Sequence, residues 1–308
     1  MAHVTRRELL GGLGAASATL LCPSLSSAGS RTSHTFKLGE FEIAILSDGH
    51  LMIPTQFLAR NVSEEEIKAW LGQSGGMVTP ASNVTLVRTP SDLILIDVGA
   101  GPHFMPTAGK LADNMETAGI DRQVITKVVF THAHPDHLWG TFDDFDEPMF
   151  PNASYFIPAA EWNFWTADDV ISRLPEDRQN FAPGARRTLS RIREKLRTIK
   201  PGEDIVTGVR ATDTSGHTPG HISIEVVSGN DALIVLADAL THATISFAHP
   251  EWKPAGDHYD AERAVATRMA LLDRLATDRT RLIGYHLPFP GLGHAERSGS
   301  AYRYIPIG

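Results

Sequence analysis

The densest group of potential metal ligands lies in residues 131–137, which read T-H-A-H-P-D-H. Within it, His132, His134, Asp136 and His137 fall within six positions. Imidazole and carboxylate groups suit Zn²⁺, and also Mn²⁺, Fe²⁺ or Co²⁺. Alternate residues of an extended chain point the same way, so His132 and His134 can face one point. Asp136 and His137 can then turn toward a neighbouring point, which predicts two adjacent metal centres.

Three later segments supply further candidate ligands. Residues 215–221, S-G-H-T-P-G-H, contain His217, the favoured ligand, and His221, which either binds metal or supports the turn. Residues 233–238 form an apolar stretch ending in Asp238, whose two carboxylate oxygens could serve two metals at once. His286 follows another apolar stretch. Because each candidate follows a predicted strand, all of them can meet at one edge of the sheets.

Composition excludes several classes of protein. The chain has 308 residues, 42% of them hydrophobic and 21% charged, which excludes global disorder and collagen-like repeats. The net charge of −8 argues against a nucleic-acid partner that is bound by phosphate neutralisation. The single cysteine can form neither an internal disulfide nor a thiolate zinc cage. The 14 histidines are about twice the ordinary number, so histidine is the expected metal ligand.

The first 28 residues are predicted to be a cleaved signal. Arg6 and Arg7 precede an uncharged stretch rich in Leu, Ala, Gly and Ser that ends at Ala28 in a small-x-small pattern. Paired arginines before a mildly apolar run resemble a twin-arginine export signal. The alternative, a membrane-spanning helix, is disfavoured by the weak hydrophobicity and by Pro23. We therefore expect residues 29–308 to form a single domain in the periplasm or outside the cell, without stable membrane insertion.

Strand pairs separated by helices must position the ligands. They recur in both halves of the chain, which predicts one α/β domain with a coarse internal duplication. The predicted strands are a pair within residues 36–46, a hairpin of 83–87 and 93–97, a buried strand at 125–130, a hairpin of 222–227 and 232–236, and a final strand at 281–285. The predicted helices are 108–119, 184–199 and 261–276.

Taken together, these motifs resemble the metallo-β-lactamase-fold hydrolase superfamily. The resemblance rests on T-H-A-H-P-D-H, G-H-T-P-G-H, the apolar strand ending in Asp238, His286, and the upstream I-L-I-D-x-G at residues 94–99. It covers the chain from about Phe36 to its end. It implies an αββα sandwich, in which two mixed β-sheets face each other and carry helices on their outer faces.

The resemblance also implies a role for each ligand. One divalent ion, expected to be Zn²⁺, is held by His132, His134 and His217, and a second by Asp136, His137 and His286. Asp238 bridges the two ions, and Asp97 orients a ligand or buffers a proton from outside. Asp136 or Asp238 would take the proton of a metal-bridging hydroxide, so these two residues are the predicted catalytic residues. His221, His242 and His294 are candidates for supporting the ligands.

Two closer likenesses suggest a substrate class. Residues 286–294 and 302–306 look like the group containing methyl parathion hydrolase, whereas 240–242 and 249–252 look like quorum-quenching lactonases. A metal-dependent hydrolase of lactones, esters or phosphotriesters is therefore predicted. Phosphotriesters are mostly man-made, so a lactone or ester is the expected native substrate. Asp238 argues against penicillin hydrolysis, because true metallo-β-lactamases tend to carry Cys or Ser there.

The expected partner is a small molecule with an apolar acyl or aryl group, which an apolar pocket wall would bind. Candidates for that wall are Trp162, Phe164, Trp165, Phe289 and Leu292, although packing in the core would explain the first three equally well. Related exported hydrolases are often dimers, which leaves a homodimer open. Two alternatives to the hydrolase remain at this point: a mononuclear-iron sulfur dioxygenase of the same superfamily, and a non-catalytic metal-binding protein.

Overall fold

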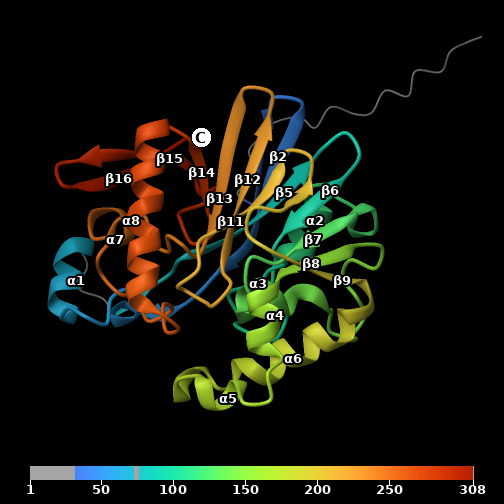
Figure 1. Ribbon diagram of the computed structural model, residues 1–308, viewed down its shortest axis with the longest axis horizontal. Coiled ribbons are helices and arrows are strands. Elements are labelled where there is room, and N and C mark those ends of the chain that lie inside the picture. Colours follow the sequence, from blue (N-terminus) through green and yellow to red (C-terminus); the bar gives the residue numbers. More distant parts are fainter. Residues whose placement is uncertain (1–31, 73–75, 308) are drawn as a thin grey trace, which may run out of the picture.

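Two seven-stranded sheets face each other, and helices cover the outer face of each (Figure 1). The computed structural model describes residues 32–72 and 76–307, so the predicted signal at residues 1–28 lies outside the described residues. Both sheets contain parallel and antiparallel pairs. The predicted αββα sandwich is therefore confirmed.

Each sheet is built from one half of the chain. The first has the order β1-β2-β5-β6-β7-β8-β9, with β1 (Ser33–Leu38), β2 (Phe41–His50), β5 (Ala81–Arg88), β6 (Leu93–Ile96), β7 (Lys127–Val129), β8 (Ser154–Pro158) and β9 (Leu196–Ile199). The second runs in order from β10 to β16, with β10 (Asp204–Val206), β11 (Val209–Asp213), β12 (Ile222–Ser228), β13 (Asp231–Ala237), β14 (Arg281–Gly284), β15 (Leu292–Ser298) and β16 (Ala301–Pro306). A small separate pair consists of β3 (Ile53–Pro54) and β4 (Met77–Val78).

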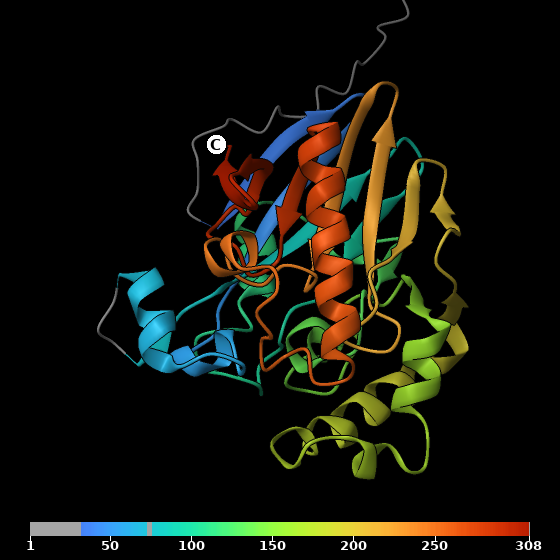
Figure 2. The ribbon, with the colours of Figure 1, turned by 60° about the vertical axis from the view of Figure 1, so that its left-hand side comes forward.

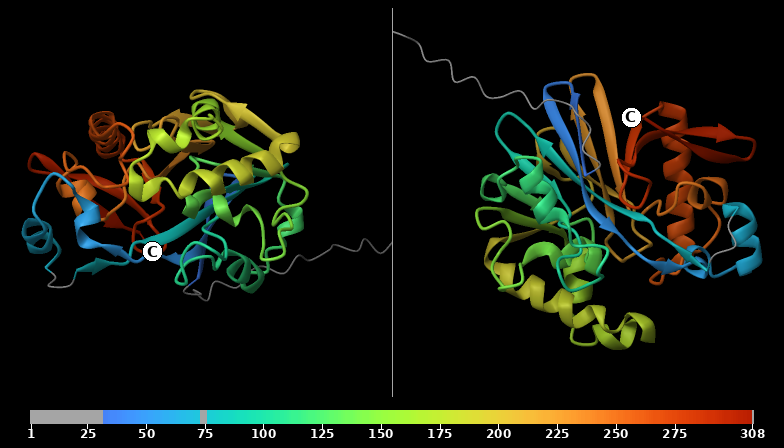
Figure 3. Two further views of the ribbon diagram at one scale, coloured as in Figure 1. Left: turned by 90° about the horizontal axis from the view of Figure 1, so that it is seen from below. Right: turned by 180° about the vertical axis from the view of Figure 1, so that it is seen from behind.

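The helices divide between the two outer faces (Figure 3). Those that pack on the first sheet are α2 (Leu111–Thr117), α3 (Pro135–Leu138), α4 (Ala159–Trp165), α5 (Val170–Arg173) and α6 (Phe181–Ile192). Those on the second are α7 (Ile245–Ala248) and α8 (Ala261–Asp278). Helix α1 (Glu64–Leu71) packs with the β3–β4 region, which projects from the sandwich (Figure 2). Short 3-10 helices are η1 (Thr55–Leu58), η2 (Arg122–Val124), η3 (Trp139–Thr141), η4 (Glu176–Arg178) and η5 (Arg193–Lys195).

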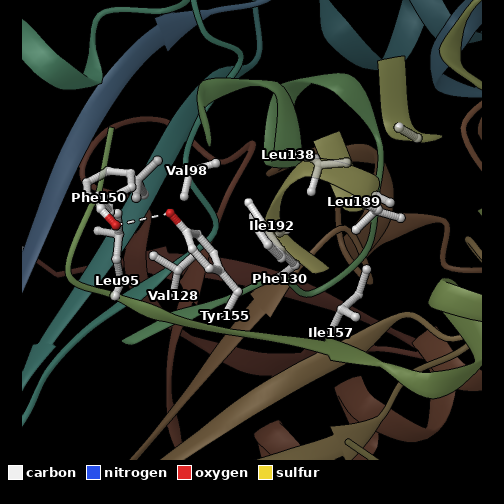
Figure 4. Close-up of a cluster of buried hydrophobic side chains, with 14 of the residues drawn as sticks. Leu95, Val98, Val128, Phe130, Leu138, Phe150, Tyr155, Ile157, Leu189 and Ile192 are labelled. Atoms are coloured by element: carbon white, nitrogen blue, oxygen red, sulfur yellow. Dashed lines mark hydrogen bonds between the residues drawn. The ribbon is translucent and has the colours of Figure 1, made fainter. Parts of the chain in front are cut away.

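Strand β6 shows how the layers are joined. Its four apolar residues alternate in direction: Leu93 and Leu95 enter the core under the helices, while Ile94 and Ile96 enter the core between the sheets. A strand buried on both faces has no polar side, which explains its continuous apolar run. Figure 4 shows part of the outer core, in which the hydroxyl of Tyr155 donates to the carbonyl of Phe150 over 3.1 Å.

The predicted strands are confirmed, with shifts at their ends, but residues 281–285 are not the final strand, because β15 and β16 follow and pair with each other beside β14. The predicted helix at residues 184–199 is wrong in its last part. Helix α6 ends at Ile192, and residues Leu196–Ile199 form β9 instead. This segment pairs in parallel with β8, placing Tyr155 opposite Leu196 and Pro158 opposite Ile199. Pairing satisfies the exposed backbone groups of β8, a long-range gain that outweighs the local helical pattern.

The topology brings several strand ends to one edge of the sandwich. Strands β6, β7 and β8 run parallel in the first sheet, and β13 and β14 run parallel in the second. Side chains that follow these strands therefore share one end of the molecule. Among the described residues, no helix has both the length and the apolar character needed to cross a membrane.

Asp48 at the end of β2 connects three segments near this edge. Its Oδ2 accepts hydrogen bonds from the backbone N–H groups of Ala100 and Gly109 over 2.8 and 3.1 Å, and its Oδ1 accepts one from Leu111 over 2.9 Å. Burial raises the pKa of Asp48 to about 6, although these bonds oppose the rise. Gly99 has a φ of 75°, and a Cβ there would lie 2.5 Å from the Asp48 carboxyl carbon. The close approach therefore requires glycine.

We predict that Asp48→Asn destabilises the fold by about 1–3 kcal/mol, because its amide N–H₂ would face backbone donors and leave one or more unsatisfied. Urea unfolding followed by circular dichroism measures this loss. Glu116→Gln on the exposed face of α2 is the control and should change stability by less than about 0.5 kcal/mol. Equal stability of the two variants would refute the role of Asp48.

Candidate metal centre

The seven candidate ligands meet at the edge where the strands end. They form two buried groups, one of His132, His134, His217 and Asp238 and the other of Asp136, His137 and His286. Within each group, one nitrogen or oxygen atom from every residue lies within 4.8 Å of the others. The loop after β7 and helix α3 supplies four of the seven, and the β11–β12 loop and the ends of β13 and β14 supply the rest.

In the first group, three imidazole rings converge. His134 Nδ1 lies 3.0 Å from His132 Nε2 and 3.0 Å from His217 Nε2. His217 Nε2 is also 3.3 Å from Asp238 Oδ2. The rings come from segments more than 80 residues apart in sequence, so only the fold assembles the group.

Asp238 also reaches the second group. Its Oδ1 lies 3.1 Å from His137 Nε2, and its Oδ2 lies 3.4 Å from His286 Nε2. Asp136 Oδ2 is 3.3 Å from the same nitrogen of His286. Asp238 therefore stands between the two groups, in the place that a bridging carboxylate requires.

Hydrogen bonds on the outer side fix the orientation of three rings. His217 Nδ1 lies 2.9 Å from Asp257 Oδ1, and His137 Nδ1 lies 2.8 Å from Asp97 Oδ2. His286 Nδ1 lies 2.8 Å from the Ala81 carbonyl oxygen. Ionised carboxylates and carbonyls only accept, so each ring carries a proton on Nδ1. Each Nε2 therefore faces inward, and once a metal ion replaces any proton there, its lone pair is placed as in the usual arrangement of a histidine ligand.

The inward-facing atoms fit two divalent cations. Asp136 Oδ2, His137 Nε2 and Asp238 Oδ1 are buried and have no hydrogen-bond partner among residues 32–72 and 76–307. Lone pairs and carboxylate oxygens face one another there, and a cation is what satisfies them. Nitrogen and oxygen donors without thiolate suit Zn²⁺ and its neighbours in the first transition row.

Electrostatics favour positive charge at this centre. Burial, together with the neighbouring histidines, holds the pKa values of His132 and His134 well below their usual range, so both rings are neutral. Burial also opposes the charge of His286, but Asp238 and Asp136 outweigh it and raise its pKa to about 10. The same carboxylates that hold a proton there would hold a metal ion.

Asp97 and His221 support the centre from outside. Asp97 has a φ of 61°. Its carboxylate accepts hydrogen bonds from the backbone N–H and the hydroxyl of Thr131, each over 2.8 Å, and it also contacts His137 Nδ1. His221 Nε2 accepts from the Asp238 backbone N–H over 3.0 Å, and its Nδ1 lies 3.1 Å from the Thr214 carbonyl. Both nitrogens are engaged, so His221 supports the turn and belongs to neither group.

The supporting roles predicted for His242 and His294 are wrong. His242 Nδ1 accepts from the backbone N–H groups of Thr244 and Ile245 at the start of α7. His294 Nε2 lies 3.2 Å from Glu296 Oε1 on β15. Each ring is bound within its own segment, and nearness to a motif in sequence did not bring it to the centre.

Glu161 supports the candidate ligands, a role that the sequence did not predict. Its Oε1 accepts from the Gly220 backbone N–H over 2.7 Å, and its Oε2 accepts from the Ala133 N–H over 3.2 Å and from Trp165 Nε1 over 2.8 Å. One buried carboxylate thus connects the loop of His132 and His134 to the loop of His217. A glutamate inside an aromatic, apolar run was the signal that could have revealed it, because an unpaired carboxylate is rarely buried.

Asp257 was also missed, and no pattern in its segment marks it. It lies in the loop before α8, where it holds His217 Nδ1 and forms an ion pair with the buried Arg268. Burial alone would raise the pKa of Asp257, but Arg268 and His217 hold it below its usual value. Its carboxylate therefore stays ionised and can orient His217.

A cavity of about 250 Å³ lies beside the donor groups. Five of the seven candidate ligands line it: His134, Asp136, His217, Asp238 and His286. Most of the remaining wall is apolar, with Leu51, Met52, Ile53, Pro54, Phe57, Leu58, Pro80, Phe104, Met105, Phe181 and Pro254.

The five residues predicted to form this wall do not line it. Phe164 and Trp165 are buried in the outer core of the first sheet, and Trp162 packs against the same core. Phe289 and Leu292 pack between the two sheets. The apolar face of α4 turns toward the sheet that it covers, which explains why its aromatic side chains serve packing.

We predict that Glu161→Gln lowers the affinity for zinc by about 10- to 100-fold, because its amide group faces backbone donors and loosens both ligand loops. Competition with a chromophoric chelator measures the affinity directly. Glu194→Gln, exposed in η5, is the control and should bind zinc like the unaltered protein. Unchanged affinity in the Glu161 variant would show that the carboxylate does not position the ligands.

Comparisons with known proteins agree with this geometry. The profile of the metallo-beta-lactamase superfamily matches residues 78–284. The structure is similar to AidC, a dizinc quorum-quenching lactonase in complex with the product N-hexanoyl-L-homoserine, at 31% identity and a TM-score of 0.85, over 90% of this chain and 98% of that one. It is also similar to AbOPH, a hydrolase of the beta-lactamase superfamily, at 27% identity and a TM-score of 0.84, over 91% and 99% of the two chains.

A probable metal-dependent hydrolase from Staphylococcus aureus shares the fold at 18% identity and a TM-score of 0.74, over 88% of this chain and 99% of that one. No curated protein sequence matches the chain. The profile match covers most of the chain. The structural similarity to AidC and AbOPH extends over almost the whole length of both of those proteins. The chain therefore belongs to the metallo-β-lactamase superfamily, among its metal-dependent hydrolases.

Proposed function

We propose that the protein is a dinuclear metal-dependent hydrolase that opens a lactone, or cleaves a related ester, carrying an apolar acyl group. The observation that carries this proposal is the position of the cavity. One side of it consists of candidate metal ligands, and the rest is mostly apolar. A hydrolysable group and a hydrophobic chain can therefore be bound in the same space.

His132, His134 and His217 would hold one ion, Asp136, His137 and His286 the other, and Asp238 both. Two bound divalent ions would supply a hydroxide at neutral pH and would polarise the substrate's carbonyl oxygen. The ligand set with a carboxylate between the groups supports two ions, as in the dizinc lactonase AidC. It favours this arrangement over the single iron of a sulfur dioxygenase.

The chain's own residues would perform the proton transfers. Asp136 and Asp238 both line the cavity, so their carboxylates can contact a bound substrate. One of them takes the proton from the attacking water and delivers it to the leaving oxygen, which is the alcohol oxygen of an opened lactone. The apolar wall excludes bulk water and strengthens these interactions.

The comparisons support a lactone over the alternatives. AidC carries a hydrolysed acyl-homoserine product, and its acyl group is of the kind that the apolar wall would bind. The sequence resemblance of residues 286–294 and 302–306 keeps phosphotriesters among the compounds to be tested. We further propose export by the twin-arginine pathway, a proposal supported by Arg6, Arg7 and the stretch that ends at Ala28.

We predict that the zinc-loaded protein has its highest kcat/KM with an acyl-homoserine lactone. The expected margin over an aryl ester, a phosphotriester and a β-lactam is at least about tenfold, because the flexible acyl chain of the lactone can extend along the apolar wall while its ring carbonyl faces the candidate ligands. Hydrolysis rates across this panel test the prediction. Comparable or faster turnover of any other compound would overturn the choice of lactone.

We predict that His134→Ala lowers the bound metal below two equivalents and reduces kcat/KM by more than about 100-fold, because a loss of a direct ligand should exceed the effect of losing an outer partner. Metal analysis, circular dichroism and kinetics separate loss of metal from loss of fold. His103→Ala, at an exposed histidine, is the control and should match the unaltered protein. Two retained metals and full turnover in the His134 variant would refute the assignment of His134 as a metal ligand.

A further inference from the structure

Arg178 is the one lysine or arginine among the described residues that line the cavity. It is the last residue of η4, and α6 begins three positions later at Phe181. No hydrogen bond or ion pair joins it to a candidate ligand among the described residues, although the charge of Asp136 acts on it from a distance. A cation therefore stands in a mostly apolar wall, and the chemistry at the metal centre does not account for it.

Aromatic contacts hold the guanidinium in place. The Cζ atom of Arg178 lies 4.4 Å from the centre of the Phe57 ring and 5.2 Å from that of Phe181. Stacking on aromatic faces suits the flat guanidinium and orients its N–H groups. The Phe181 ring centre also lies 5.9 Å from the ring centre of His134. Arg178 and the metal centre are therefore close enough for one small molecule to contact both.

The guanidinium has donors without acceptors. Its Nε and Nη2 atoms are buried and have no hydrogen-bond partner in the described part of the chain. Burial lowers the pKa of Arg178, yet an arginine keeps its charge at neutral pH. A buried N–H without an acceptor costs free energy, and a ligand that brings an oxygen atom removes that cost.

We propose that Arg178 binds an oxygen acceptor of the substrate, a carbonyl or carboxylate oxygen near the bond that is cleaved. This inference rests on the proposed lactone hydrolysis and defines its substrate class as acylamino lactones. The lactone carbonyl then faces the metal centre, the amide oxygen pairs with Arg178, and the acyl chain lies along the apolar wall. Alkyl lactones without the amide leave Arg178 unpaired, so the enzyme discriminates against them.

The test compares two lactones of equal chain length, an N-hexanoyl-homoserine lactone and a γ-alkyl-γ-butyrolactone that has no amide. Arg178→Met keeps an unbranched side chain that can pack on Phe57 but removes the donors. We expect it to lower kcat/KM for the acylamino lactone by about 10- to 100-fold, mainly through KM, because a hydrogen bond to a charged group is lost. The alkyl lactone should change by less than about threefold. Arg193→Met, at an exposed arginine in η5, is the control and should alter neither rate.

Metal content and binding of the open product N-hexanoyl-homoserine, measured by calorimetry, complete the experiment. An unchanged zinc content with weaker product binding in Arg178→Met supports the proposal, even if neither lactone is turned over. Absence of turnover would refute only the proposed function. An equal loss of rate on both lactones would assign Arg178 to general packing and overturn the proposal. Unchanged rates and unchanged product binding would overturn it as well.

Discussion

The structure depends on bringing candidate metal-binding groups together in a buried centre, away from water. Lone pairs of imidazole nitrogens and the oxygens of Asp136 and Asp238 converge in a buried centre, and several have no hydrogen-bond partner among the described residues. Such a cluster is unfavourable until a cation neutralises it. The scaffold must therefore hold these side chains away from water, and the sandwich does so by mounting them at the ends of buried strands.

Rigidity is reinforced by acceptors just outside the centre. Asp97, Asp257 and the Ala81 carbonyl each fix one ring, and Glu161 joins two of the ligand loops. These groups are themselves held: Asp257 pairs with the buried Arg268. These three rings and the two loops are thus part of a chain of contacts that ends in the core, so small shifts at the metal centre are opposed by packing far from it.

The chemistry and the choice of substrate arise from different parts of the fold. The metal ligands follow the strands, whereas the cavity wall comes largely from 3-10 helices, loops and the start of α6, including Phe57, Phe104, Arg178 and Phe181. Loops can change without disturbing the sheets. This division lets the wall change while the candidate ligands stay in place, so the wall carries the information about the substrate.

The sequence by itself determined the candidate ligands and the layered fold. Four candidate ligands lie close together in residues 131–137. The continuous apolar runs of the central strands directly indicate that these strands are buried on both faces. Only the tertiary structure identified Glu161, Asp257 and Arg178, rejected Trp162, Phe164 and Trp165 as the cavity wall, and converted residues 196–199 from helix to strand. The physical reason is the range of the interactions. Metal-binding motifs and strand patterns are local, whereas supporting hydrogen bonds, cavity walls and edge-strand pairing arise between segments that the fold alone brings into contact.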